Sequence, residues 1–248
     1  MSWPQIGAFL GFCLAVIALL LLAISPTGWR AGWWHFRFAF AWLMTSSGFI
    51  AAAAAVVSLL ALALGWPELG ARGLAMAAAG LILGTILVYV PWQYNRLRST
   101  VPRIHDITTD TDNPPEFAAV LAARAAENAA TAIYEGPELA RSQKAAYPDL
   151  APLELFSPPA KAFEQALAVA RSMPGWTIVA SDPASGRIEA SQTSRWFGFT
   201  DDIVIRVAPH GSGSRVDMRS LSRQGRSDFG VNAARIRAYM GALRKRLC

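Results

Sequence analysis

The side chains that could carry chemistry lie on two alternating segments near the C-terminus. Residues 201–208 alternate apolar Ile203, Ile205 and Val207 with charged residues, and residues 215–223 alternate in the same way. Pairing Val207 with Val216 puts Arg206 opposite Asp217 and separates polar from apolar residues, whereas a slip of one residue would mix them. The two segments therefore predict a cluster of acids and arginines: Asp201, Asp202, Arg206, Asp217, Arg219 and Arg223.

Three interpretations compete for this cluster, which Glu189 joins on the same predicted face. It could be a ladder of ion pairs that stabilises the sheet or holds the Pro-rich loop before it. It could be a pocket in which arginine forks bind an anionic ligand. It could also hold a catalytic carboxylate pair, Asp201 or Asp202 with Asp217, but neighbouring arginines would keep both acids ionised, whereas such a pair needs separated pKa values. The ladder is the leading interpretation.

A second candidate is the turn over residues 224–230, between the last strand and the last helix. Glycines and exposed amides at a helix N-terminus can bind an anion, and the candidate residues are Gly225, Ser227, Asp228 and Gly230. The turn is not a nucleotide-binding Walker loop, because no Gly-Lys-Ser/Thr follows. Asp228 as a simple cap of the helix start is the alternative.

Other chemistries find little support in the residue types. The two cysteines, Cys13 and Cys248, form no C-x-x-C, and the three histidines lie far apart. Asp106, Asp110 and Asp112 beside His105 form an acidic cluster without the EF-hand pattern, so a solvated strand end is favoured over a metal site. We expect no catalytic residue, metal or cofactor, and the sequence names no reaction.

The charges divide the chain into two parts. Of 248 residues, the first 100 contain five Arg, one Glu and no Lys, while the rest carries 18 Lys+Arg and 16 Asp+Glu. Three uncharged apolar runs, 6–24, 38–64 and 73–90, occur in the first part, and each is close to the roughly 20 residues that a spanning helix needs. Tryptophans flank the runs, as at membrane interfaces. Residues 1–94 are therefore predicted to be a transmembrane region.

Loop charge and small residues refine this picture. Arginines follow the first and third runs, so the positive-inside rule predicts an inner-membrane protein with its C-terminal domain in the cytoplasm. Gly7-x-x-x-Gly11 and Gly80-x-x-x-Gly84 let helices approach closely, either within the chain or in a homo-oligomer. Because no charged residue lies within a run, transport by these helices alone is not expected.

The second part predicts an α+β domain: antiparallel sheet with helices packed on one face. After a basic connector, 95–102, residues 103–248 contain a strand at 103–110, a helix from Pro114 to about Asn128, an irregular Pro-rich loop at 135–160 and a helix at 160–173. Strands follow at 175–181, 187–194, 201–208 and 215–223, and a basic helix at 231–247 ends the chain. That helix could rest on anionic headgroups, whereas nucleic-acid binding is not expected.

Several blocks in this domain resemble a known family. They are Tyr147-Pro148, Gly198-Phe-Thr-Asp-Asp202, Val204-x-Arg206, Val216-Asp-x-Arg-Ser220, Ser222-Arg223, Gly225, Ser227-Asp-Phe-Gly230 and Asn232-x-x-Arg-Ile236. Over roughly residues 103–247 the chain resembles the uncharacterised family called domain of unknown function 1499. The resemblance implies no established activity. Some members look like lipoproteins or secreted proteins, which would place the domain outside the cytoplasm, but this sequence lacks a lipobox.

The sequence thus favours an integral membrane protein whose α+β domain binds an unknown partner or ligand at the membrane surface without catalysis. The alternatives are a membrane-bound enzyme that uses the Asp/Arg cluster, and a lipid or small-molecule carrier with an apolar cavity. A pocket with converging carboxylates would favour the enzyme, a hollow apolar groove the carrier, and a filled core with a charged face the binding module.

Overall fold

The structure is a computed structural model that describes residues 2–247, the side chain of Leu247 excepted. The chain divides into two compact units, residues 1–99 and 100–248. We describe each unit by itself.

The first unit is built from long apolar helices. It contains α1 (Trp3–Arg30), α2 (Phe36–Phe38), a π-helical segment η1 (Ala39–Met44), α3 (Thr45–Gly65), a 3-10 turn η2 (Trp66–Glu68) and α4 (Gly70–Thr100). Three helical stretches, Trp3–Arg30, Phe36–Glu68 and Gly70–Thr100, are long and apolar enough to cross a membrane, and each contains one predicted span.

The helices run further than the apolar runs predict. The basic connector expected at 95–102 is helical up to Thr100, and Pro26 and Pro91 lie inside helices. Such prolines are tolerated in spanning helices when a neighbour accommodates the distortion. Pro91 lies against Gly48, where an added Cβ would come within 2.8 Å of the proline ring.

Small residues let the three helices meet closely at Ser58. A Cβ at Gly11 would lie 2.2 Å from the Ser58 hydroxyl oxygen, and one at Gly80 would lie 2.3 Å from the same atom. Gly84 packs in the same way against the backbone of Ala51, with 2.7 Å between its notional Cβ and the carbonyl oxygen. Both predicted small-xxx-small faces are therefore covered by helices of the same chain, and an association of copies would need another face.

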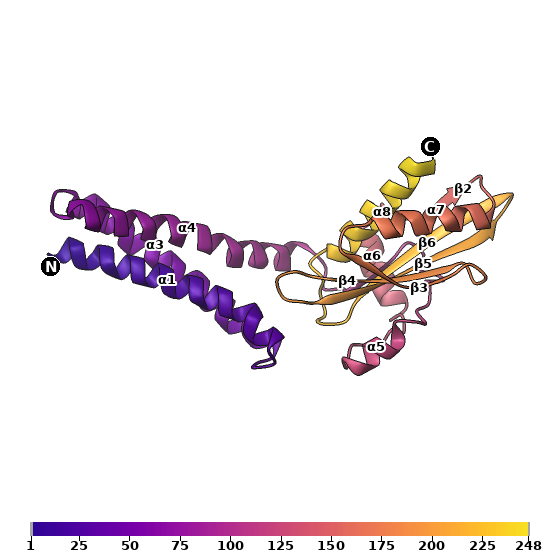
Figure 1. Ribbon diagram of the computed structural model, residues 1–248, viewed down its shortest axis with the longest axis horizontal. Helices are drawn as coiled ribbons and strands as arrows, with labels where there is room; N and C mark the ends of the chain where they lie inside the picture. The colour runs from indigo at the N-terminus through magenta and orange to yellow at the C-terminus, as the bar shows by residue number, and fades with distance from the viewer. Residues whose placement is uncertain (1, 248) are drawn as a thin grey trace. The chain divides into compact units, whose positions relative to one another are not determined.

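The second unit is a six-stranded antiparallel sheet with helices, as the α+β prediction states. The strands are β1 (Asp106–Thr108), β2 (Leu153–Leu155), β3 (Trp176–Asp182), β4 (Arg187–Thr193), β5 (Thr200–His210) and β6 (Gly213–Ser222), in the order β1-β6-β5-β4-β3, with β2 also paired to β6. The helices are α5 (Leu121–Ala126), α6 (Pro137–Ala146), α7 (Pro159–Ser172) and α8 (Val231–Leu247). Figure 1 shows α7 and α8 lying over one face of this sheet.

Two predicted segments of this unit are wrong in detail. The helix expected from Pro114 to Asn128 is reduced to α5, because the amides of the preceding residues 118–120 bind the Glu189 side chain instead of forming a longer helix. The loop expected at 135–160 contains α6 and β2. Pro137 occupies the first turn of α6, where a missing N–H costs nothing.

The apolar face of the sheet forms the main core with α7 and α8. Ile203 and Ile205 of β5 are fully buried there beside Phe163 of α7 and Ile236 of α8. The Tyr239 hydroxyl donates a hydrogen bond to the carbonyl oxygen of Ala166 at 3.0 Å and so joins the two helices. On α8, Ile236, Met240 and Leu243 are buried against this core, while the side chain of Leu247 lies outside the described residues.

Candidate functional site

The register predicted for the last two strands is confirmed. Val207 pairs with Val216, Arg206 with Asp217, and Val204 with Arg219. Since side chains alternate across a strand, this register places charged residues of β4, β5 and β6 on the face that α7 and α8 do not cover. These residues do not form an open surface, because residues 109–134, called the strap below, bind to most of them.

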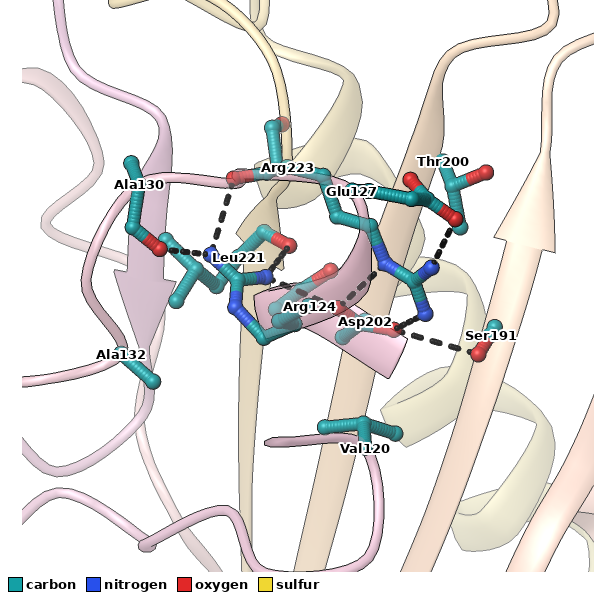
Figure 2. A network of polar contacts seen from close by, with 12 residues as sticks. Val120, Arg124, Glu127, Ala130, Ala132, Ser191, Thr200, Asp202, Leu221 and Arg223 are labelled. Carbon is teal, nitrogen blue, oxygen red and sulfur yellow. Dashed lines mark hydrogen bonds and ion pairs between the residues drawn. The ribbon is translucent and has the colours of Figure 1, made fainter. Parts of the chain in front are cut away.

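Asp202 is the centre of the first group on this face. It is fully buried and accepts hydrogen bonds from Arg223 at 2.7 and 2.9 Å, from Arg124 at 2.8 Å and from Ser191 at 3.1 Å. Arg223 also donates to Glu127 at 2.5 Å. Figure 2 shows how Arg124 and Arg223 converge on Asp202. The hydrogen bonds from Arg223 to Asp202 raise the pKa of the Arg223 guanidinium.

Arg124 joins the strap to the sheet. One of its terminal nitrogens donates to Asp202, and the other donates to the carbonyl oxygen of Ala130 at 2.8 Å (Figure 2). Weaker contacts of 3.4 Å reach the carbonyl oxygens of Leu221 and Ser222 on β6. Arg124 therefore bridges α5, the rest of the strap and two strands through one buried cation.

A second group surrounds Asp217. This carboxylate accepts hydrogen bonds from Arg206 at 2.9 Å and from Arg215 at 3.0 and 3.1 Å. Asp110 of the strap accepts from the same two arginines, at 3.1 Å from Arg206 and 2.7 Å from Arg215. Two acids and two arginines thus pair with one another, and the hydrogen bonds that Arg215 donates to Asp217 raise the pKa of Arg215.

Arg219 forms the third group and is almost fully buried. It binds both oxygens of Asp106 at 2.9 and 2.8 Å, and it donates to the carbonyl oxygens of Pro115 and Ala132. Its guanidinium lies 5.1 Å from the ring centre of Phe117 and 5.4 Å from that of Tyr134. Burial raises the pKa of Tyr134 to about 12, so this phenol is neutral beside the cation.

Glu189 of β4 holds the middle of the strap. It is fully buried, and its carboxylate accepts hydrogen bonds from the amides of Ala118, Ala119 and Val120, each at 3.0 Å. Arg187 lies 3.1 Å from the same carboxylate. Glu189 therefore occupies an anion site that the backbone of the strap forms.

The predicted cluster is divided between the two faces of the sheet. Asp202, Arg206, Asp217, Arg219 and Arg223 share the strap-covered polar face. Asp201 does not, because neighbouring residues of a strand point to opposite faces. It binds Arg235 of α8 at 2.6 Å on the helix-covered face. Asp201 and Asp217 therefore lie on opposite faces of the sheet, so they cannot form the catalytic pair considered above.

In the predicted anion-binding turn, the amides bind a carboxylate of the turn itself, that of Asp228. Asp228 accepts hydrogen bonds from the amides of Gly230 at 2.9 Å and Asn232 at 2.7 Å, as a cap of α8 does. Burial raises the pKa of Asp228, although these two hydrogen bonds lower it. Gly225 and Ser227 lie in the same turn, where the Ser227 hydroxyl accepts a long bond of 3.4 Å from the Phe229 amide.

The acidic cluster at 106–112 is dispersed among different partners. Asp106 binds Arg219, Asp110 binds Arg206 and Arg215, and Asp112 lies 3.3 Å from Lys144. Within residues 2–247, no group of three His, Cys, Asp or Glu side chains is arranged to hold a metal ion.

Three residues of the polar face were missed from the sequence: Arg124, Arg215 and Asp106. The sequence could have indicated Arg215, because it lies two residues before Asp217 in a predicted strand and must therefore share the face of Asp217. Asp106 was assigned to the acidic cluster. Arg124 was placed on a predicted helix, and nothing in the local pattern relates it to Asp202, which lies 78 residues later.

Beside the Asp217 group, the surface has an open concavity of about 630 Å³. The start of the strap, α6, β2, β6 and α8 all contribute to it, and its charged lining residues are Asp110, Asp112, Lys144, Glu154, Arg215 and Arg244. We call it the polar groove. Its lining carries both signs of charge.

These features define a class of protein: an α+β domain whose sheet is covered by helices on one face and by a strap on the other, on a chain with three candidate spanning helices. Comparison with family models identifies the particular family. The chain belongs to the family described as "Protein of unknown function (DUF1499)", whose model matches residues 106–243. The comparison with curated proteins gives no match.

Proposed function

We propose that this protein is a membrane-anchored, non-catalytic binding module whose polar groove receives a partner or ligand at the membrane surface. The observation that carries the proposal is the pairing of the polar face. Asp106, Asp202, Asp217 and Glu189 are all buried, and each is bound by arginine, by backbone amides or by both. Acid–base catalysis needs a carboxylate that can reach a substrate, and these acids are already bound by partners inside the domain.

The apolar face argues in the same direction. A carrier would need a hollow between the sheet and its helices, but Ile203, Ile205, Phe163, Ile236 and Tyr239 are all buried together in one core. The polar groove is a concave surface of the described domain, and its volume is in the range of ligand sites. Its mixed charges suit a polar partner segment or a ligand with both signs of charge.

Site-specific photocrosslinking in native membranes tests the groove. A photoreactive amino acid is placed at Ala151 or Arg244 of the groove, and at Lys161 of α7 as an exposed control outside it. We expect light-dependent adducts at the two groove positions and not at Lys161. Equal adduct yields at all three positions would contradict the proposal.

A charge change sharpens this test. Lys144→Glu alters the groove wall, and Lys161→Glu is a matched change of the same charge on α7. Crosslinking from Ala151 should fall in the Lys144→Glu protein and persist in the Lys161→Glu protein. If the two variants behave alike, the groove is not the binding surface.

We also propose that the domain faces the cytoplasm of a bacterial cell, with the N-terminus outside. The support is the charge count, with Arg30 and Arg37 after the first span and Arg96 and Arg98 after the third. A fluorescent protein fused after Cys248 should fluoresce, and alkaline phosphatase at the same position should be inactive. The reverse result would place the domain outside the cytoplasm and move the search for partners to the envelope.

A further inference from the structure

We propose that one end of the C-terminal sheet is a membrane-contact surface, on which Trp196 enters the headgroup layer between arginines that bind anionic lipids. This surface, called the sheet-end surface below, consists of the exposed residues Arg103, Arg195, Trp196, Arg226 and Val231. The inference requires that the three apolar helices cross a bilayer, but it does not depend on the polar groove.

Three segments of the chain meet at this end of the sheet. The β4–β5 connection begins and ends at the pair Thr193 and Thr200. The end of β6 lies there too, because the amide of Ser222 donates to the His105 carbonyl oxygen at 3.0 Å. The amide of Asp228 donates to the Ile104 carbonyl oxygen at 3.2 Å, which fixes the following turn to the same strand entry. Figure 1 shows the β4–β5 and β6–α8 connections at one end of the sheet.

The linker between α4 and this end of the sheet is short. The third candidate span ends at Thr100, and His105 is already bonded to the end of β6. Five residues extend at most about 18 Å, so the sheet end cannot lie further than that from the end of α4. The opposite end of the sheet, with the β3–β4 and β5–β6 turns, has no such tether.

The β4–β5 connection is built to present an aromatic ring. Phe197 is buried and stacks on Phe199 with 5.3 Å between ring centres. The Ser194 side chain accepts a hydrogen bond from the Phe199 amide at 3.0 Å, and its amide donates to the Phe199 carbonyl oxygen at 2.8 Å. Trp196, between these anchors, remains 44% exposed. A tryptophan held in this way suits the interface, where its amphipathic ring is favoured and little ordering is needed.

The charges at this end favour an anionic surface. Arg103, Arg195 and Arg226 are exposed, and two acids near this end have partners within the domain. Asp201 binds Arg235, and Asp228 caps α8. Exposed arginines near a bilayer are attracted by anionic headgroups, and tryptophan adds the apolar part of the contact.

The basic residues of α8 are less well placed for this role. Arg244, Lys245 and Arg246 come at least 13 residues after α8 begins at Val231. At about 1.5 Å per residue they lie about 20 Å along the helix from the sheet end. Arg246 also binds Gln165, and Arg237 binds Asp149. The sheet-end surface is therefore the better candidate for headgroup contact than the last helix.

Hydrogen exchange of the full-length protein in lipid nanodiscs tests the inference. Nanodiscs of phosphatidylcholine alone are compared with nanodiscs containing equal parts of phosphatidylcholine and phosphatidylglycerol. We expect slower exchange in the peptides that cover residues 193–200 and 224–231 when the anionic lipid is present. Peptides that cover the β3–β4 turn, residues 182–187, at the untethered end should exchange equally in both lipids.

Variants identify the groups responsible. Trp196→Ser and the double change Arg195→Glu with Arg226→Glu should each abolish the lipid-dependent slowing, while Lys161→Glu should leave it intact. Unchanged exchange in β5 and β6 shows that each variant is folded. The inference is overturned if the wild-type peptides exchange equally in the two lipids, or if the slowing survives both sets of changes. Loss of crosslinks at Ala151 and Arg244 would instead contradict the proposal that the polar groove binds a partner or ligand. It would not affect the inference about the sheet-end surface.

Discussion

At the residue scale, three buried acids of the polar face, Asp202, Asp217 and Glu189, each have more than one partner. Asp217 binds Arg206 and Arg215, and Asp110 binds the same two arginines. Removing one member of such a group leaves the others charged and buried without compensation, which costs more than the intact pair contributes. The arginines therefore stabilise the position of the strap rather than providing a free cation for a ligand.

Arg206→Glu tests this group in the full-length protein. The new carboxylate would face Asp110 and Asp217, so we expect a loss of about 3 kcal/mol in the free energy of unfolding of the domain. Adding Asp217→Arg should restore part of the loss, but not all of it, because the new cation lies beside Arg215. Chemical denaturation of the two single variants and the double variant measures the coupling, and strictly additive effects would contradict the pairing.

Asp228 predicts a dependence on pH. Burial raises its pKa in the folded domain above the unfolded value of about 3.9. A raised pKa means that the folded state binds the proton more tightly, so the stability from this group is complete below about pH 4 and is lost as the pH rises through the folded pKa. The wild-type protein should therefore lose stability relative to Asp228→Asn as the pH rises from 4 to 7.

Thermal unfolding midpoints of both proteins over this pH range give the difference between them. Asn keeps one acceptor oxygen, so it can bind the Gly230 or the Asn232 amide but not both. The variant can therefore be less stable than the wild type at every pH. The prediction concerns only how the difference in unfolding midpoint between the two proteins changes with pH. A difference that stays constant, or that moves in the opposite direction, would show that Asp228 is not destabilised by burial.

At the element scale, the strap is held to the sheet by many polar contacts and by a small apolar cluster. Glu189 binds three of its amides, Arg219 binds two of its carbonyl oxygens, and Arg124 reaches back to Asp202. The apolar cluster joins Phe117 and Val120 of the strap to Val204 and Leu221 of the sheet. The strap has little regular structure, so its backbone groups depend on these side chains.

Glu189→Gln should loosen the strap without unfolding the sheet. The amide group of Gln replaces one acceptor oxygen with a donor and removes the negative charge, so at least one of the amides 118–120 loses its partner. We expect faster hydrogen exchange at these amides and a loss of about 1–3 kcal/mol in stability. Glu164→Gln, an exposed change on α7, is the matched control. Unchanged exchange in the strap would argue that the apolar cluster alone holds it.

At the scale of the whole molecule, the two units are stabilised by different means. The first unit, which contains the three candidate spans, packs small residues such as Gly11, Gly80 and Ser58 and exposes large apolar ones, including Phe49 and Leu64. The domain buries its own core of aliphatic and aromatic side chains between the sheet and two helices. Each unit therefore has the interior that its surroundings require.

Residues 100–248 should consequently fold when they are produced without the spans. We expect a soluble domain that unfolds cooperatively, with exchange protection in β5 and β6 equal to that in the full-length protein. Cooperative denaturation and matching protection patterns are the measurements. An expressed fragment that lacks protected amides in these strands would show that the first unit is required for folding.

Much of the architecture follows from local patterns. The period-2 alternation around Ile203, Ile205 and Val207 determined the strand and its register against Val216, because only one register separates apolar from polar residues. Charge-free runs of near-spanning length determined the three long helices. The division of Asp201 from Asp202 was also accessible from the sequence, since adjacent residues of a strand face opposite sides.

Only the tertiary structure decided what covers the polar face. Arg124 meets Asp202, and Asp106 meets Arg219, across 78 and 113 residues of chain. Local sequence carries no record of such distances, because ion pairs place no periodic pattern on the intervening residues. The sequence by itself determined that a charged face exists. The path of the strap decided that this face is buried and that its charges are paired. The physical reason is that buried charges require partners, and the strap supplies them.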